Sequence, residues 1–194
     1  MDKRKAARQR VRTKITEALL ELMGEKPFSE ISVIEIVNRA GVARQSYYRN
    51  FSSKEKVVEG FYFGLRDLGL AEMRRRQPEN DCQWVSVILE VMSTKREELL
   101  RLYHGGFSKV HLDIINQFVE DAAGDMPAFS PDRYKLYCYA GAVYNTTLVW
   151  YQGGCRETPE EVARIICSFQ AVDLLPNLVE YASRLREEQA PAEE

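Results

Sequence analysis

Apolar side chains recur along this chain at the three- and four-residue spacing of an α-helix, and no segment alternates polar and apolar residues as a half-buried strand does. The first apolar stripe lies in the region before Gly24 and Pro27, which end it. That stripe consists of Val11, Ile15, Ala18, Leu19, Leu22 and Met23. The pattern predicts an all-α protein that begins with an amphipathic helix.

Start and stop signals divide the next part of the chain into three further helices. Ser32 and Glu35 form a Ser-x-x-Glu capping box, which predicts the start of a short helix. Gly41 supplies a turn, and a second short helix is expected over 43–50. A third helix is expected after the Ser-Ser-Lys-Glu run at 52–55.

The rest of the chain is expected to form a helical bundle. Further helices are expected over 84–92, 96–107 and 110–122, from Pro131 to Gly153, and from Thr158 onward. The last of these starts with a strong signal, since Thr158 is followed by Pro159 and by a glutamate that completes a capping box. We expect Pro176 to kink or split the final helical stretch and the polar tail at 187–194 to be loose.

One stretch, 136–155, contains no charged residue over twenty positions, which is the length of a membrane span. Its Asn, Thr, Gln and Gly residues dilute the apolar content too far for insertion, so we expect a helix that is buried on most sides. In a chain of this size, one face of such a helix can meet the core and another can meet a second subunit. Ala140 and Gly141 would let two backbones approach closely there. The stretch therefore favours a subunit interface over a membrane span.

Charge is unevenly distributed along the chain. The 194 residues carry 27 basic and 29 acidic side chains, and a hydrophobic content of 45% excludes a disordered chain. Residues 1–60 hold 13 basic and 8 acidic side chains, a net of +5, which leaves a net of −7 for the remainder. A basic end on an acidic body indicates a polyanion partner at that end. A solvated, frayed terminus would carry the same charges.

Residues 28–56 are the candidate functional segment of the chain. They place a tight Ala40-Gly41-Val42 turn between two short helices, which is typical of a helix-turn-helix. The residues expected to form its small core are Ile36, Val37, Ala40, Val42, Tyr47 and Phe51. The exposed side of the second helix would then present Arg44, Gln45, Ser46, Tyr48 and Arg49. Such side chains donate hydrogen bonds to base edges or phosphates.

This segment resembles the DNA-binding domain of the tetracycline-repressor (TetR) family of bacterial transcriptional regulators. The matching residues are Ser32, Ile36, Ala40-Gly41-Val42, Tyr48, Phe51 and Ser53-Lys54-Glu55. The resemblance covers about a third of the chain and is specific, because many positions agree in order and spacing. It implies a helix-turn-helix DNA-binding domain at 1–55 and a helical ligand-binding and dimerisation domain at 56–194.

The resemblance also implies roles for single residues. Phosphate contacts fall to Tyr48, Asn50 and Lys54, and Ser32 caps a helix whose N-terminus lies near the DNA backbone. The recognition stretch holds Arg44, Gln45, Ser46 and Arg49. The alternative for the two arginines is a solvated charged face, and for Tyr48 a half-buried core aromatic. The basic N-terminal arm would either enter a minor groove or steer association.

One departure from the family pattern concerns the start of the recognition helix. Ala43 stands where Ser or Thr commonly caps this helix. An alanine cap costs about 1 kcal/mol of helix stability. Packing must therefore hold the recognition helix in place.

Members of this family pair through their last two long helices and bind a small molecule in the C-terminal bundle. The resemblance therefore implies a homodimer, a pseudo-palindromic double-stranded DNA operator, an unknown small-molecule effector and the role of a repressor. The interface candidates are Ala140, Gly141, Leu148, Tyr151, Val162, Ile165, Ile166 and Phe169. The effector candidates are Trp84, Tyr103, His104, Phe107, Tyr137 and Tyr144, for which core packing is the alternative.

Several other functions are not supported by the sequence. It has no GxSxG, HExxH, Walker or GxGxxG motif, so we expect no enzyme, catalytic residue, metal or cofactor. With no signal peptide, we expect a cytoplasmic protein without membrane contact, and its four cysteines are expected to be reduced, buried hydrophobes. Two alternatives to a ligand-responsive repressor remain. They are a helical protein-interaction module and a family member without ligand control, either an activator or a constitutive regulator.

Overall fold

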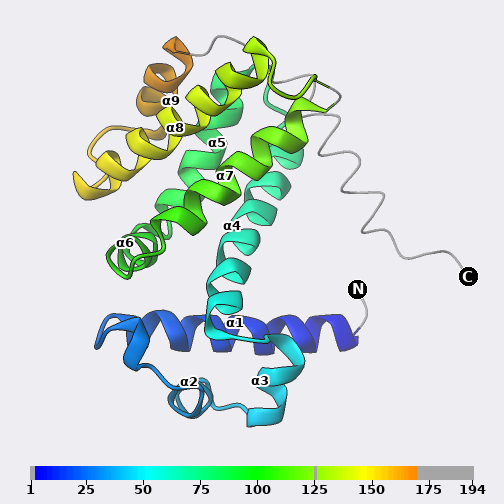
Figure 1. Ribbon diagram of the computed structural model, residues 1–194, viewed down its shortest axis with the longest axis vertical. Helices are drawn as coiled ribbons and strands as arrows, with labels where there is room; N and C mark the ends of the chain where they lie inside the picture. The colour runs from blue at the N-terminus through cyan, green and yellow to red at the C-terminus, as the bar shows by residue number, and fades with distance from the viewer. Residues whose placement is uncertain (1–2, 125, 170–194) are drawn as a thin grey trace, which may run out of the picture. The chain divides into compact units, whose positions relative to one another are not determined.

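The computed structural model describes residues 3–124 and 126–169, and within these ranges its regular elements are all helices (Figure 1). In chain order they are α1 (Lys3–Met23), the 3-10 turn η1 (Phe28–Glu30), α2 (Val33–Ala40), α3 (Arg44–Asn50), α4 (Lys54–Arg76), α5 (Asp81–Ser93), α6 (Arg96–His104), α7 (Ser108–Ala123), α8 (Pro131–Gln152) and α9 (Pro159–Ser168). The predicted all-α fold class is confirmed. The expected break at Pro176 and the tail at 187–194 lie outside the described residues.

The predicted helix starts are present as side-chain hydrogen bonds. The Ser32 hydroxyl accepts from the Glu35 N–H at 3.2 Å, and the Thr158 hydroxyl accepts from the Glu161 N–H at the same distance. Both capping boxes are complete. For α4 the cap is Ser53, whose hydroxyl accepts from the backbone of the third helical residue at 3.3 Å. The helix therefore starts one residue later than a Ser-x-x-Glu box at 52–55 would place it.

The described residues divide into two compact units. The first, here called the head, comprises the described residues up to Leu65 together with Glu97–Ser108. The second, here called the body, comprises Arg66–Arg96 and the described residues from Lys109 onward. The head therefore extends beyond residue 55 and includes nearly all of α6.

The head is built around α1, which packs against both α2 and α3. The apolar stripe predicted for α1 is its buried side, with Ile15 and Leu19 fully enclosed. Ile36 of α2 and Tyr47 of α3 are also fully buried against this core. Burying one such large apolar side chain stabilises the fold by about 1.5–3 kcal/mol. Phe28 and Phe107 meet edge to face with 4.6 Å between ring centroids, which joins η1 to the residue after α6.

In the body, α9 packs along α5 and also lies beside α8 (Figure 1). Leu89 of α5, Leu136 of α8 and Ile166 of α9 are among its most buried side chains. No helix among the described residues combines the length and the hydropathy needed to cross a membrane.

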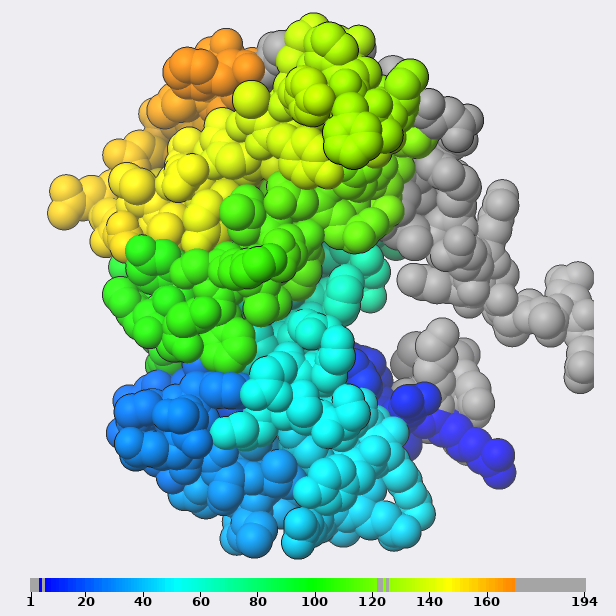
Figure 2. All heavy atoms as spheres, in the orientation of Figure 1, coloured from blue at the N-terminus to red at the C-terminus, as the bar shows by residue number. Residues whose placement is uncertain are grey.

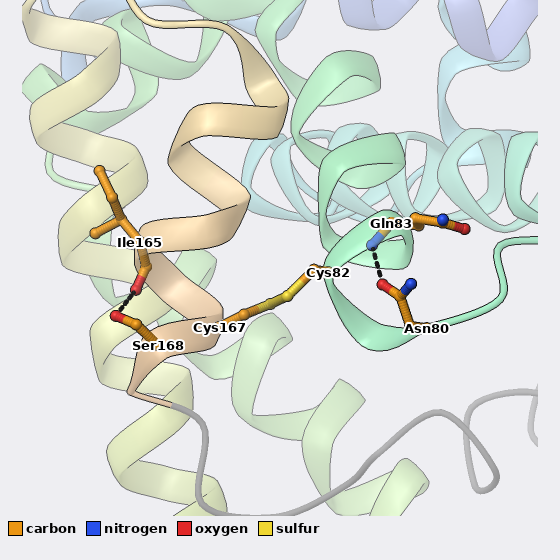
Figure 3. The surroundings of a disulfide bond; sticks show 6 residues. All are labelled: Asn80, Cys82, Gln83, Ile165, Cys167 and Ser168. Atoms are coloured by element: carbon orange, nitrogen blue, oxygen red, sulfur yellow. Dashed lines mark hydrogen bonds between the residues drawn. A yellow bond between two sulfur atoms is a disulfide. The ribbon is translucent and has the colours of Figure 1, made fainter.

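The cysteines depart from the sequence-based expectation. Cys82 of α5 and Cys167 of α9 form a disulfide, with a Cα–Cα distance of 5.9 Å that lies in the usual range for such a bond (Figure 3). The prediction that all four cysteines are reduced is wrong for this pair, because helix packing brings together two residues that are 85 positions apart. Cys138 is exposed and Cys155 is half-buried, so neither is a fully buried hydrophobe.

Candidate nucleic-acid interface

The turn between α2 and α3 has a fixed backbone geometry. Gly41 adopts the left-handed conformation, with φ 62° and ψ 39°. Its N–H donates to the carbonyl of Asn38 at 3.2 Å, and the Val42 N–H donates to the carbonyl of Val37 at 3.1 Å. These bonds end α2 and turn the chain sharply into α3. The predicted helix-turn-helix is therefore present in the backbone.

The recognition helix α3 is held by packing rather than by a cap. Ala43 occupies the cap position and makes no side-chain hydrogen bond there, as the sequence predicts. Tyr47 is completely buried, and Phe51 directly after the helix is nearly so. The two rings contact each other at 6.3 Å between centroids. One side of α3 is thus anchored in the head core, which leaves the opposite side free to meet a partner.

That opposite side presents hydrogen-bond donors. Arg44, Gln45 and Arg49 are exposed, and Tyr48 keeps 52% of its surface. The Arg44 guanidinium lies over the Tyr48 ring at 5.6 Å, with its Nη2 donating to the phenol oxygen at 3.4 Å. The surfaces of α2 and α3 adjoin in the face drawn in Figure 2.

The arginines of α3 differ from Arg39 of α2 in their ion pairing within the described part of the chain. Among the residues that the structure describes, Arg44 and Arg49 have no carboxylate partner. Arg39 of α2, by contrast, binds Glu25 of α1 through both nitrogens, at 2.8 and 3.0 Å. The positive charge on α3 therefore remains available to an external anion.

Asn50, at the end of α3, is held mostly by its own neighbours. Its amide donates to the Ser46 carbonyl at 2.7 Å, and its side-chain oxygen accepts from Arg8 at 3.4 Å. Its backbone carbonyl accepts from Arg12 at 2.9 Å, and the Arg12 guanidinium also lies over the Phe51 ring at 4.3 Å. Burial, and then the charge of Arg8, lowers the pKa of Arg12.

Arg8 and Arg12 thus bring the basic side of α1 next to α3. Neither residue was singled out in the sequence as a site residue. The signal that could have found them is the run of basic residues near the N-terminus, read with helical spacing. Because they are four positions apart, the two side chains lie on one face of α1.

Lys54 has internal partners. Its ammonium donates to the carbonyl of Phe28 at 2.8 Å and to the carbonyl of Ile31 at 2.5 Å, and it lies over the Phe28 ring at 4.5 Å. These contacts tie the start of α4 to η1 and to the chain entering α2. Lys54 therefore positions the head, and a phosphate contact from it stays a prediction.

The start of α2 carries a second electrostatic feature. Lys26 forms an ion pair with Glu35, the residue that completes the Ser32 capping box. The Lys26 hydrogen bond, followed by the bonds from Ser32, lowers the pKa of Glu35 to about 2. Glu35 is therefore ionised at neutral pH and holds Ser32 at the helix N-terminus.

The interface candidates on α8 and α9 differ widely in exposure. Four of them are buried within the chain itself: Ala140, Tyr151, Val162 and Ile166. Gly141 and Leu148 are partly exposed, while Ile165 and Phe169 keep 51% and 73% of their surface. Val149, which was not among the candidates, is 67% exposed. Only part of the predicted set is thus available to a partner.

The effector candidates fall in both units. Tyr103, His104 and Phe107 belong to the head, where Phe107 is buried against Phe28. The three others lie in the body. Trp84 stacks on Phe118 at 5.1 Å, Tyr144 meets His111 at 5.4 Å, and Tyr137 is exposed and donates to Glu120.

Two features of the body suit a bound molecule. The indole Nε1 of Trp84 is buried and has no hydrogen-bond partner among the described residues. Burial lowers the pKa of His111 to about 4, so its imidazole is neutral at pH 7. His111 and Phe118 both lie on α7 at a spacing of two helical turns, which places them on one side of that helix. No group of three or more metal-ligating side chains occurs among the described residues.

Comparison with known proteins agrees with this geometry. Residues 15–60 match the family model described as bacterial regulatory proteins, tetR family. Over 103 residues the chain is 23% identical to YvdT of Bacillus subtilis (strain 168), an HTH-type transcriptional regulator that is itself described as uncharacterized. That alignment covers 50% of this chain and 53% of YvdT, so the chain spans about half the length of the curated relative it matches.

A solved structure extends the likeness to the fold of most of the chain. The crystal structure of a TetR transcriptional regulator from Streptococcus agalactiae 2603V has a TM-score of 0.57 at 16% sequence identity. The similarity covers 85% of this chain and 96% of that one, and at this identity it concerns the fold alone. The predicted resemblance to the tetR family is confirmed by the family-model match at residues 15–60, and the solved structure adds the likeness in fold.

Proposed function

We propose that this chain is a dimeric, ligand-responsive transcriptional repressor of the tetR family, whose family model matches residues 15–60 of its helix-turn-helix head. The observation that carries the proposal is the free side of α3. It presents Arg44, Gln45 and Arg49 from a helix whose other side is anchored by Tyr47. Guanidinium and amide groups are the side chains that read base edges in a major groove.

A second copy of the chain is the proposed partner of α8 and α9. On α8 an exposed stripe at helical spacing contains Tyr134, Cys138, Asn145 and Val149, with Gly141 partly exposed between them. The stripe spans most of the charge-free stretch. Exposed Ile165 of α9 and Phe169, the residue directly after that helix, lie four positions apart, and α9 contacts α8. These seven residues are uncharged and most of them are apolar, which suits a self-complementary two-fold contact.

The proposed effector site lies in the body, around Trp84, Phe118, His111 and Tyr144. Stacked rings, a neutral imidazole and an indole N–H that has no partner among the described residues suit a planar, uncharged molecule that accepts a hydrogen bond. A repressor releases DNA only if the effector binds one dimer state more tightly than the other. In our proposal the preferred state spaces its two heads wrongly for the duplex.

Selection of bound duplexes from a random pool, with purified protein, tests the DNA-binding proposal. A symmetric dimer should enrich pseudo-palindromes whose half-sites are centred about 34–36 Å apart or a multiple of that distance. Binding should weaken as salt rises, with a log–log slope near −0.9 for each phosphate neutralised. Enrichment of no sequence, together with no binding in dilute buffer, would leave a protein-interaction module as the better interpretation.

Sedimentation of a matched pair of variants tests the dimer surface. Ile165→Asp introduces a charge at a position that is 51% exposed on α9 and should dissociate the dimer. Ile34→Asp makes the same change at a position that is 55% exposed on α2 and should leave the dimer intact. Equal sedimentation of the two variants would contradict the proposed surface.

A further inference from the structure

The disulfide joins two helices at the ends where each one starts or stops. Cys82 is the second residue of α5, directly after the Asn80–Asp81 start, and Cys167 is the penultimate residue of α9 (Figure 3). Both cysteines are half-buried, so small oxidants and reductants can reach the bond. The sequence separation of 85 residues means that only the packing of α9 along α5 brings the sulfurs together.

We propose that Cys82 and Cys167 are a reversible thiol-oxidation site, at which hydrogen peroxide closes the disulfide and fixes the end of α9 on α5. The effect on assembly rests on the proposed dimer surface, whereas the chemistry of the site does not. Cys138 and Cys155 lie outside this pair and remain free thiols.

The first step of the oxidation occurs at Cys82. A thiolate in the first turn of a helix is stabilised by the unpaired N–H groups there, which makes it the attacking sulfur. It attacks one peroxide oxygen: the S–O bond forms, the O–O bond breaks, and the leaving hydroxide takes up the thiol proton as water. The product is a sulfenic acid on Cys82.

The second step closes the bond. The thiolate of Cys167 attacks the sulfenic sulfur, so that the S–S bond forms and the S–O bond breaks. The departing hydroxide takes up the Cys167 proton as a second water. Two thiols thereby lose two electrons, and one peroxide is reduced to two waters. A dithiol reductant reverses the reaction by exchange and becomes a disulfide itself.

The bond acts on the proposed dimer surface because of where α9 carries its side chains. Cys167 and Ile165 are two positions apart, which places them about 200° apart around the helix. Figure 3 accordingly shows Cys167 directed to α5 and Ile165 directed away from it. A disulfide on the inner side therefore holds the outer side, with Ile165 and Phe169, in one position. Oxidation should strengthen the dimer for that reason.

Mass spectrometry of the full chain tests the chemistry. After dithiothreitol all four cysteines should react with an alkylating agent, and after hydrogen peroxide only two should. Peptide mapping should find Cys82 joined to Cys167, and a dithiol should restore four reactive thiols. The oxidised form should melt roughly 5–15 °C higher than the reduced form. A different pairing, no pairing, or a bond that a dithiol does not reduce would overturn the proposal.

Two variants isolate the role of the pair. Cys167→Ser should lose the crosslink and the melting shift, and dimedone should label a sulfenic acid on Cys82. Cys138→Ser, the matched control at an exposed free thiol, should keep both responses. Dimedone labelling of Cys138 in place of Cys82 would contradict the assigned order of steps.

The dimer dissociation constant measures the effect on assembly. It should fall about tenfold or more on oxidation of the wild type, and it should not change in Cys167→Ser. A change within twofold in the wild type would overturn the coupling to α9. A chain that forms and reduces the bond normally yet dimerises in neither state would contradict the proposed function and leave the thiol site intact.

Discussion

The backbone conformation of the turn between α2 and α3 can be tested by one substitution whose effect on stability has a clear direction. Gly41 has φ 62°, and a Cβ added there would meet nothing within 4 Å. Gly41→Ala therefore adds no clash and changes only the backbone energy. Gly64 in α4 is the matched control, because it also has open space around its Cα but lies within a regular helix.

The expected magnitudes follow from the two conformations. The left-handed conformation costs an L-residue about 1–2 kcal/mol. Alanine also makes the unfolded chain less flexible, which offsets about 0.5 kcal/mol of this cost. Gly41→Ala should therefore lower the free energy of unfolding of the head by about 1 kcal/mol. Gly64→Ala should stabilise it by roughly 0.5–1 kcal/mol, because glycine is unfavourable inside a helix. The two variants should differ by about 1.5–2 kcal/mol.

Urea unfolding followed by circular dichroism, at one fixed protein concentration, measures both variants. Their midpoints should move in opposite directions from the wild type. Gly41→Asn should lie close to the wild type, since asparagine tolerates the left-handed region. If Gly41→Ala unfolds at the same urea concentration as Gly64→Ala, the turn does not require the left-handed conformation and our account of the helix-turn-helix is wrong.

Three further changes test the head and the body. Folding lowers the pKa of Glu35 to about 2, so the stability that its ionised form contributes is present above its unfolded pKa and is lost as pH falls from about 4.5 to 2. In Glu35→Gln the free energy of unfolding should therefore fall less steeply over this pH range. Urea midpoints of the variant and the wild type, measured across that range, would show the difference. The same pH dependence in both proteins would contradict the pairing of Glu35 with Lys26. Gly60→Ala places a Cβ 3.0 Å from the Phe51 ring, which costs about 1–3 kcal/mol, while alanine in the helix returns roughly 0.5–1 kcal/mol. Urea unfolding should therefore show a net loss of about 1 kcal/mol, and a variant more stable than the wild type would be contrary evidence. Ala140→Leu should lower the free energy of unfolding by about 1–3 kcal/mol, because Ala140 is buried within the chain. This loss should persist under conditions where the protein is monomeric. A loss found only in the dimer would argue for an interface position.

Local signals explain how much of the head could be predicted. The capping box at Ser32 and the left-handed glycine after α2 are set by residues within a few positions of each other, so the sequence contains them directly. The prediction that Tyr47 points into the core and Tyr48 points outward is confirmed by their burial. It could be made because adjacent positions on a helix point about 100° apart.

Contacts between distant residues explain what could not be predicted. The carbonyls that bind Lys54 belong to residues more than twenty positions earlier, so only the folded chain brings them together. The same holds for Cys82 and Cys167. Ala140 lies on a helix with few charges on either side, and its pattern does not tell which side faces the chain's own core.

The most direct test of the central claim is methylation of guanine N7 by dimethyl sulfate on a duplex that the protein has selected. N7 lies in the major groove and accepts hydrogen bonds from arginine. Our account predicts two protected clusters, separated by about one helical turn or a multiple of it. Arg44→Ala should reduce protection in both clusters. A bound duplex whose guanines react as they do in free DNA would contradict the placement of α3 in the major groove.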